Sequence, residues 1–183
     1  MSVKKATVLF DRYPSANVTV NESKTIATKV SGPLVWRYNV TCTQPSFIND
    51  TYTYRFRVVS SFSGKSIMFG WSSSQFSTTQ QNVCTDVNKG RWLYIGPTVE
   101  TASYPSGTGS VGERLKTAVI QTNDVVETSL NVEDKTISCM INGVDYGTVF
   151  RNVPYMLTVP SFLFRCDCSI ELLSTDAPVE QRK

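Results

Sequence analysis

The residues of this chain that could carry out catalytic chemistry are few, because histidine is absent from all 183 positions. Histidine is the usual general base in enzymes, the partner of nucleophilic serine and cysteine, and the commonest ligand of catalytic zinc. A catalyst built on this sequence would have to move protons with Lys, Asp, Glu or Tyr instead. The composition therefore predicts a protein that is not an enzyme.

One glycine-rich segment matches a nucleotide-binding pattern by its letters. Residues 107–112 read Gly-Thr-Gly-Ser-Val-Gly, which fits G-x-G-x-x-G. That pattern binds a pyrophosphate because it joins a strand directly to the N-terminus of a helix. Here a polar stretch from about residue 97 precedes it, and residues 116–121 after it are rich in β-forming types. We interpret the segment as part of a long glycine loop and predict no nucleotide and no other cofactor.

The five cysteines do not have the spacing of a structural metal site. Such sites repeat a C-x₂₋₄-C pair, whereas this chain has one Cys-x-Cys pair, Cys166 and Cys168, and three isolated cysteines. Residues two apart on a strand share a face, so we expect both thiols of the pair to be buried. The sequence predicts no metal, and it favours reduced thiols in a cytoplasmic protein.

Charge and hydropathy limit the partners of the chain. The 18 basic and 15 acidic residues give a net charge of +3, and the basic residues are scattered rather than clustered. Nucleic-acid binders usually carry a dense basic patch, so a nucleic-acid partner is not favoured. No apolar run approaches the ~18 residues of a membrane span. The apolar stretch 6–10 is interrupted by Asp11, so we expect no signal peptide and no membrane insertion.

Apolar residues recur at every second position, which is typical of half-buried strands. The runs lie at residues 34–42, 52–58, 67–71, 92–94, 126–132, 137–141 and 162–172, and turn-forming residues separate them. No segment shows a helical stripe with a capping residue. This pattern predicts an all-β fold, a two-sheet antiparallel β-sandwich. We expect one domain over residues 1–175 and a disordered polar tail over 176–183.

Three stretches resemble the SPRY (B30.2-like) domain family. Residues 54–59 and 67–71 resemble its strand–turn–strand segment, which ends at Gly70 and Trp71 here. Residues 123–131 (N-D-V-V-E-T-S-L-N), followed by 134–143 with Asn142-Gly143 and by 146–150 with Gly147, resemble its strongest motif. Residues 157–160 (L-T-V-P) resemble the segment that leads into its closing strands. The resemblance covers about 52–173, and the first 50 residues match no extension of the family.

The resemblance implies a bent, concanavalin-like jelly roll without enzymatic activity, a cytoplasmic adaptor that binds a protein or short peptide. Family members bind through loops at one end of the sandwich, and two of these loops correspond by position. These are the loop before the Gly70 strand and the bend between the last two strands. The loop at about 74–81 adjoins the same face in the family. The partner-binding residues predicted in this way are Phe62, Ser63, Gly64, Lys65, Gln75, Phe76, Arg165, Cys166 and Asp167.

Two questions stay open at the level of the sequence. Lectin-like jelly rolls share this architecture and bind sugars with exposed aromatic rings, for which Trp71, Trp92 and Tyr104 are the candidates. A carbohydrate-binding domain is therefore the alternative, and it requires these rings to be exposed. The second question concerns the run 162–172, because its alternation predicts one continuous strand whereas the resemblance predicts a bend at 165–167.

Overall fold

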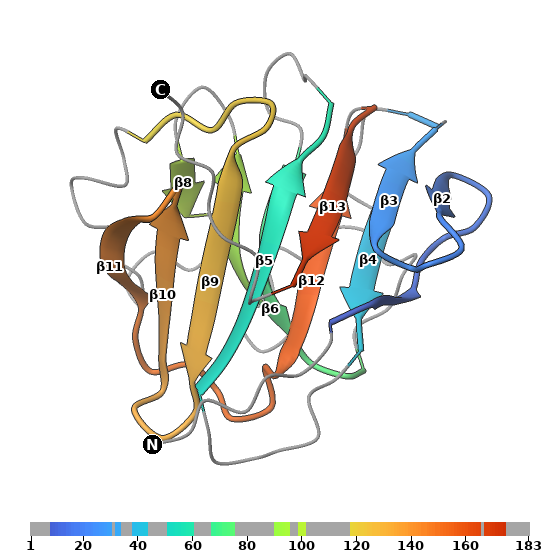
Figure 1. The fold of residues 1–183 in the computed structure, drawn as a ribbon. Helices are drawn as coiled ribbons and strands as arrows, with labels where there is room; N and C mark the ends of the chain where they lie inside the picture. The colour runs from blue at the N-terminus through green and yellow to red at the C-terminus, as the bar shows by residue number, and fades with distance from the viewer. Residues whose placement is uncertain are drawn as a thin grey trace.

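The computed structural model describes residues 8–30, 32–33, 38–43, 51–60, 67–75, 90–95, 99–101, 118–165 and 167–174. In these ranges the chain forms thirteen strands and no helix (Figure 1). The strands are β1 (Phe10–Arg12), β2 (Val18–Val20), β3 (Ile26–Lys29), β4 (Tyr38–Cys42), β5 (Thr51–Val58), β6 (Ile67–Ser72), β7 (Gly90–Ile95), β8 (Val99–Thr101), β9 (Val125–Asn131), β10 (Thr136–Ile141), β11 (Val144–Phe150), β12 (Val159–Phe164) and β13 (Ser169–Leu173).

The strands pair antiparallel into two sheets. The six-stranded sheet has the order β1-β4-β12-β6-β7-β8, and the seven-stranded sheet has the order β11-β10-β9-β5-β13-β3-β2. The two sheets form a sandwich, so the predicted all-β, two-sheet antiparallel fold is confirmed. Membrane-crossing helices are absent from the described ranges, since these contain no helix.

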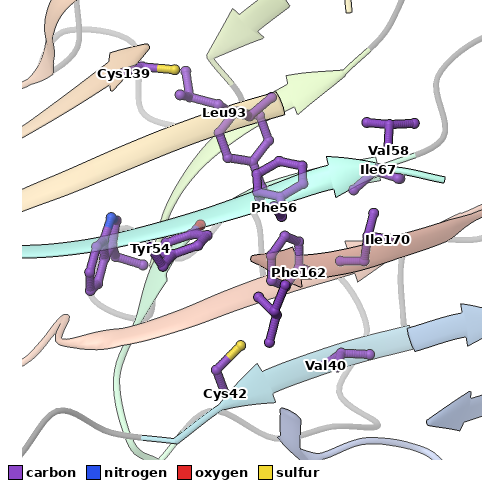
Figure 2. Close-up of a cluster of buried hydrophobic side chains, with 14 of the residues drawn as sticks. Val40, Cys42, Tyr54, Phe56, Val58, Ile67, Leu93, Cys139, Phe162 and Ile170 are labelled. Carbon is purple, nitrogen blue, oxygen red and sulfur yellow. The ribbon is translucent and has the colours of Figure 1, made fainter. Parts of the chain in front are cut away.

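The core lies between the two sheets and is rich in aromatic rings. Phe162 of β12 lies at its centre, with ring centroids 5.1 Å from Phe56 and 5.7 Å from Tyr54, both of β5 (Figure 2). Two hydrogen bonds also cross between the sheets. The Tyr54 hydroxyl donates to the Gly70 carbonyl oxygen at 3.0 Å, and the Trp71 indole Nε1 donates to Thr128 Oγ1 at 3.2 Å. The aromatic ring contacts and the two hydrogen bonds together fix the position of the two sheets relative to each other.

The alternation of β5 is explained by this core. Its residues Tyr52, Tyr54, Phe56 and Val58 face inward and are buried, whereas Thr51, Thr53 and Arg57 are exposed or half-buried. Side chains two apart on a strand share a face, so a period of two places one set in the core. The predicted strands at 126–132 and 137–141 are confirmed by β9 and β10, which show the same alternation, and the predicted strand at 67–71 is confirmed by β6.

The middle of the six-stranded sheet differs from the half-buried strands that the alternation predicts. Every residue of β4, β6 and β12 is buried, including those whose side chains point away from the core. Among the latter are Ser72 and Ser161, whose hydroxyl oxygens are 2.6 Å apart. A buried hydroxyl is costly unless it is hydrogen-bonded, and these two satisfy each other. This sheet is therefore buried on both faces at its centre.

The run 162–172 is divided between the two sheets. Strand β12 ends at Phe164 and pairs with β4 and β6, whereas β13 begins at Ser169 and pairs with β3 and β5. The bend predicted near 165–167 is confirmed, and the continuous strand is wrong. Period-two alternation continues through the bend because residues on both sides of it face the same core.

The first 50 residues supply four strands, two to each sheet. Strands β1 and β4 lie in the six-stranded sheet, and β2 and β3 lie in the seven-stranded sheet. β4 pairs with β12, and β3 pairs with β13. These residues therefore complete the sandwich. Of the four strands, the alternating run 34–42 predicted only β4.

Candidate functional site

The bend between β12 and β13 marks one end of the sandwich, which we call the bend end. Phe164 pairs with Ile67, the first residue of β6, and with Tyr38, the first residue of β4. In the other sheet, Ile170 pairs with Val58, the last residue of β5. The bend end therefore also holds the chain that leaves β5 and β3 and the chain that enters β4, β6 and β9. The arrows of β3 and β5 point toward it in Figure 1.

Two of the predicted partner-binding residues that the structure describes lie at this end. Arg165 is half-buried, and the side chain of Asp167 is 78% exposed. Phe62, Ser63, Gly64, Lys65, Phe76 and Cys166 lie outside the described residues. The described strand residues on either side of positions 61–66, Val58 at the end of β5 and Ile67 at the start of β6, lie at the bend end.

Gln75 lies at the opposite end of the sandwich, the far end. It is three residues beyond Ser72, which pairs with Val159, the first residue of β12. The structure therefore does not bring this residue together with Arg165 and Asp167, and partner binding by Gln75 stays a prediction. Because β6 runs antiparallel to β12, the start of β6 lies near the bend and its end lies far from it. Arg12 Nη2 donates to the Ser74 carbonyl oxygen at 2.7 Å and holds this chain at the far end.

A buried carboxylate organises the part of the bend end around β9 and β10. Asp124 accepts from Asn142 Nδ2 at 2.9 Å and from the Gln121 amide at 2.6 Å. Asn142 in turn accepts from the Val125 amide at 2.9 Å. Asn142 and Gly143 have φ values of 50° and 79°, the left-handed region that a tight hairpin turn requires. Sequence reasoning did not identify Asp124 as a structural residue, although it lies in the motif of residues 123–131.

A buried lysine fixes the bend itself. The side chain of Lys29, the last residue of β3, is 0% exposed. Its Nζ donates to Asp167 Oδ1 at 3.1 Å and to the Gly32 carbonyl oxygen at 3.3 Å, and it lies 4.9 Å from the centroid of the Tyr38 ring. Burial of an ammonium group costs several kcal/mol unless it is paired. The carboxylate of Asp167 therefore offsets the cost of burying the Lys29 charge, and Lys29 in turn holds the Asp167 side chain in place.

Most of the exposed large hydrophobic residues surround these two polar clusters. The described chain has six, of which Val30, Val59, Val119 and Val144 lie at the bend end and are 39–52% exposed. The other two, Tyr155 and Met156, lie in the connection from β11 to β12, at the far end. Val30 follows β3, Val59 follows β5, and Val144 begins β11. The bend end therefore combines anchored polar groups with apolar surface.

Comparison with known proteins identifies the family. The SPRY domain model matches residues 51–174, about two thirds of the chain. The chain belongs to the SPRY domain family. Members of this family are commonly protein-interaction modules, and the family is generally non-catalytic.

Solved structures agree with this assignment at the level of the fold. The SPRY domain of human HERC1 has 14% sequence identity and a TM-score of 0.65, and the alignment covers 91% of this chain and 100% of that one. The PSpry domain of TRIM65 has 13% identity and a TM-score of 0.65, with 93% of each chain covered. The NHR1 domain of Drosophila melanogaster neuralized has 15% identity and a TM-score of 0.60, with 92% and 98% covered. A search of curated protein sequences gave no match.

The two tryptophans proposed for sugar binding are core residues of this SPRY domain. Trp71 and Trp92 are both fully buried, and the Trp71 ring packs on Tyr54 with centroids 5.2 Å apart. Tyr104 lies outside the described residues. A buried ring cannot stack on a sugar, so the carbohydrate-binding alternative loses the two candidate residues that the structure describes.

Three cysteines of the SPRY domain are buried, namely Cys42, Cys139 and Cys168, and the thiols of Cys42 and Cys139 are free. Burial raises the pKa of the Cys139 thiol to about 12, and the charges of Asp145 and Glu127 add to this effect. Burial likewise raises the pKa of Cys42 well above its ordinary value. The thiolate is the reactive form, so Cys42 and Cys139 are chemically inert at neutral pH. The expected burial of Cys168 is confirmed, and no metal-ligand cluster occurs within the described ranges.

We expect the SPRY domain to lose stability as the pH rises from about 9 to 12. In the unfolded chain the Cys139 thiol releases its proton near its ordinary pKa of 9.0, whereas in the folded chain it keeps it until about 12. The unfolded state then binds fewer protons, so a higher pH favours unfolding, by about 1.4 kcal/mol per pH unit for each such group. Urea unfolding at several pH values measures the slope, and Cys139→Ala should reduce it. An equal slope of the unfolding free energy against pH in wild type and in Cys139→Ala would contradict the assignment of this pH dependence to the Cys139 thiol.

The pair of Lys29 and Asp167 should respond unequally to substitution. Lys29→Met removes the buried charge and leaves Asp167 in water, so we expect the free energy of unfolding to change by less than about 1 kcal/mol. Asp167→Ala leaves the buried ammonium without its carboxylate, and we expect a loss of about 2–4 kcal/mol. Urea unfolding of both variants checks the order. A larger loss for Lys29→Met than for Asp167→Ala would show that the carboxylate does not compensate this lysine.

Proposed function

We propose that this SPRY domain binds a protein or short peptide at its bend end and acts as a non-catalytic adaptor. The observation that supports this most is the placement of exposed apolar side chains. Four of the six exposed large hydrophobic residues of the described chain surround the bend end. Aliphatic side chains exposed around fixed polar groups are typical of protein-binding surfaces.

The rigidity of the bend end also supports binding there. The bend is held by Lys29, and the Ser169 carbonyl oxygen accepts from the Val59 amide at 2.9 Å. Ser169 itself donates its amide to Ser60 Oγ at 2.7 Å. A surface that is already ordered loses less conformational entropy when a partner binds. The described residues that hold the bend, Lys29, Val59, Ser60 and Ser169, are thus already bonded before a partner binds.

The proposal includes a cytoplasmic location and no cofactor. The buried thiols of Cys42 and Cys139 are free, which fits a reducing compartment. Fluorescence microscopy of a tagged chain tests the location, and a purely extracellular distribution would overturn it.

The binding proposal is tested by affinity purification of the whole chain from cell extract, followed by mass spectrometry. For a partner recovered with wild type, we expect the double variant Val59→Ser and Val144→Ser to bind about tenfold more weakly, since each valine contributes roughly 0.7–1 kcal/mol of apolar contact. Met156→Ser, an exposed residue of the far end, is the matched control and should bind as wild type does. Weaker binding by the control alone would place the interface at the far end and overturn the proposal.

A further inference from the structure

The carboxylate of Asp167 is held at the surface by a buried cation behind it. Lys29 is enclosed by Asp167, the Gly32 carbonyl and the Tyr38 ring, and its side chain has no exposure to solvent. Only Asp167 Oδ1 takes part in this pairing, at 3.1 Å. No described residue bonds to Oδ2, and the Asp167 side chain is 78% exposed. One oxygen is thus anchored while the other faces outward.

The arrangement fixes both the position and the direction of this acceptor. The bend that carries Asp167 lies between β12, which ends at Phe164, and β13, which begins at Ser169, so the sheets hold the chain on both sides of it. The Lys29 amide also donates to the Cys168 carbonyl oxygen at 3.0 Å, which ties the bend to the end of β3 a second time. An exposed aspartate normally samples several rotamers, whereas this one is restrained by its partner.

Apolar surface flanks the carboxylate. Val30 follows Lys29 directly in the chain, and Val59 is bonded through its amide to Ser169, two residues beyond Asp167. Both valines are exposed. Between β3 and β13, Thr28 Oγ1 and Ser169 Oγ form a hydrogen-bonded pair at 2.8 Å, so their mutual bonding leaves them less available to a ligand. The strongest outward acceptor in this neighbourhood is therefore Asp167 Oδ2.

We propose that Asp167 accepts a hydrogen bond from a basic side chain, Lys or Arg, of the bound peptide, while Val30 and Val59 contact its apolar residues. This inference rests on the proposed function, because it names the kind of peptide that the bend end binds. An ionised carboxylate only accepts hydrogen bonds, and a cationic donor gives the strongest bond to it. Lys29 acts as a positioning residue, since it orients the carboxylate from inside without contacting the ligand.

The test is selection from a random dodecapeptide display library on four immobilised whole chains: wild type, Asp167→Asn, Lys29→Met and Glu133→Gln. We expect wild type to enrich peptides with Lys or Arg at one fixed position, next to apolar residues. Asp167→Asn should lose the basic preference and keep the apolar one, because the amide retains the shape but not the charge. Lys29→Met should weaken the basic preference severalfold, and thermal unfolding verifies that each variant is folded. Glu133→Gln, the same change of carboxylate to amide at an exposed position of the far end, is the matched control and should keep both preferences.

A selected peptide then allows a charge exchange. Its affinity for Asp167→Asn should fall about tenfold, and Asp167→Lys should bind better to a peptide in which the basic residue is replaced by Glu. Peptides with no basic preference on wild type, or with the same preference on Asp167→Asn, would overturn the inference and leave binding at the bend end standing. No selection at all, or selected peptides that ignore Val59→Ser, would overturn the proposed function itself.

Discussion

Removal of residues 1–50 is expected to leave a chain that does not fold, although the remaining residues contain the whole segment matched by the family. The deletion takes β4 away from β12 and β3 away from β13, so the strands at the centre of both sheets each lose a partner. It also removes six core residues: Phe10, Val18, Ala27, Tyr38, Val40 and Cys42. A domain is stable by only about 5–15 kcal/mol, and each buried side chain of this size contributes about 1.5–3 kcal/mol.

The measurement is urea unfolding of residues 51–183, monitored by circular dichroism. We expect no cooperative unfolding transition. Coexpression of residues 1–50 as a separate chain is the control, since it returns the missing strands and should restore soluble, folded protein. A fragment that unfolds cooperatively, with a free energy near that of the whole chain, would show that the first four strands are dispensable.

Trp71→Ala is expected to cause the largest loss of any single substitution proposed for this protein. The indole is fully buried, packs on the Tyr54 ring at 5.2 Å and donates to Thr128 across the sandwich. Its loss leaves a large cavity and a buried hydroxyl without its donor, which together cost about 3–5 kcal/mol.

Chemical unfolding of the variant should therefore show a midpoint far below that of wild type, or no folded baseline. Tyr155→Ala is the matched control, because that aromatic ring is 78% exposed and its removal should change the free energy of unfolding by less than about 0.5 kcal/mol. Trp71→Phe separates the two contributions, since it keeps most of the packing and removes only the hydrogen bond. A Trp71→Ala variant as stable as the Tyr155→Ala control would contradict the burial described here.

The long strands could be predicted from the sequence because their alternation depends only on which face meets the core. β5, β9 and β10 each show this pattern over six or more residues, and each was confirmed. β1 and β2 could not be predicted, since three residues cannot establish a period. The burial of Asn39 and Ser161 could not be predicted either. Alternation assigns such polar residues to the solvent-exposed face of a strand, whereas in the six-stranded sheet that face is buried as well.

The candidate site could be predicted only in part, because a site depends on the direction of strands as well as on their existence. The bend at 165–167 followed from the family resemblance. The position of Gln75 at the far end did not, because the direction of β6 relative to β12 cannot be read from the local sequence. Lys29 gave a weak signal that was missed. It lies two residues after Ala27, so once β3 is known, its side chain must point to the same buried face.

The position of β12 and β13 in the two sheets has a consequence for how the protein is made. Each pairs on both sides with strands that precede it in the chain, and Thr28 is separated by 141 residues from its partner Ser169. During translation, neither sheet is complete until these two strands have left the ribosome. Until then, the edges of β3, β4, β5 and β6 that face β12 and β13 have unpaired backbone hydrogen-bonding groups. Nascent chains stalled before residue 159 should therefore remain protease-sensitive and depend on chaperones, and protection should appear only once β13 has emerged.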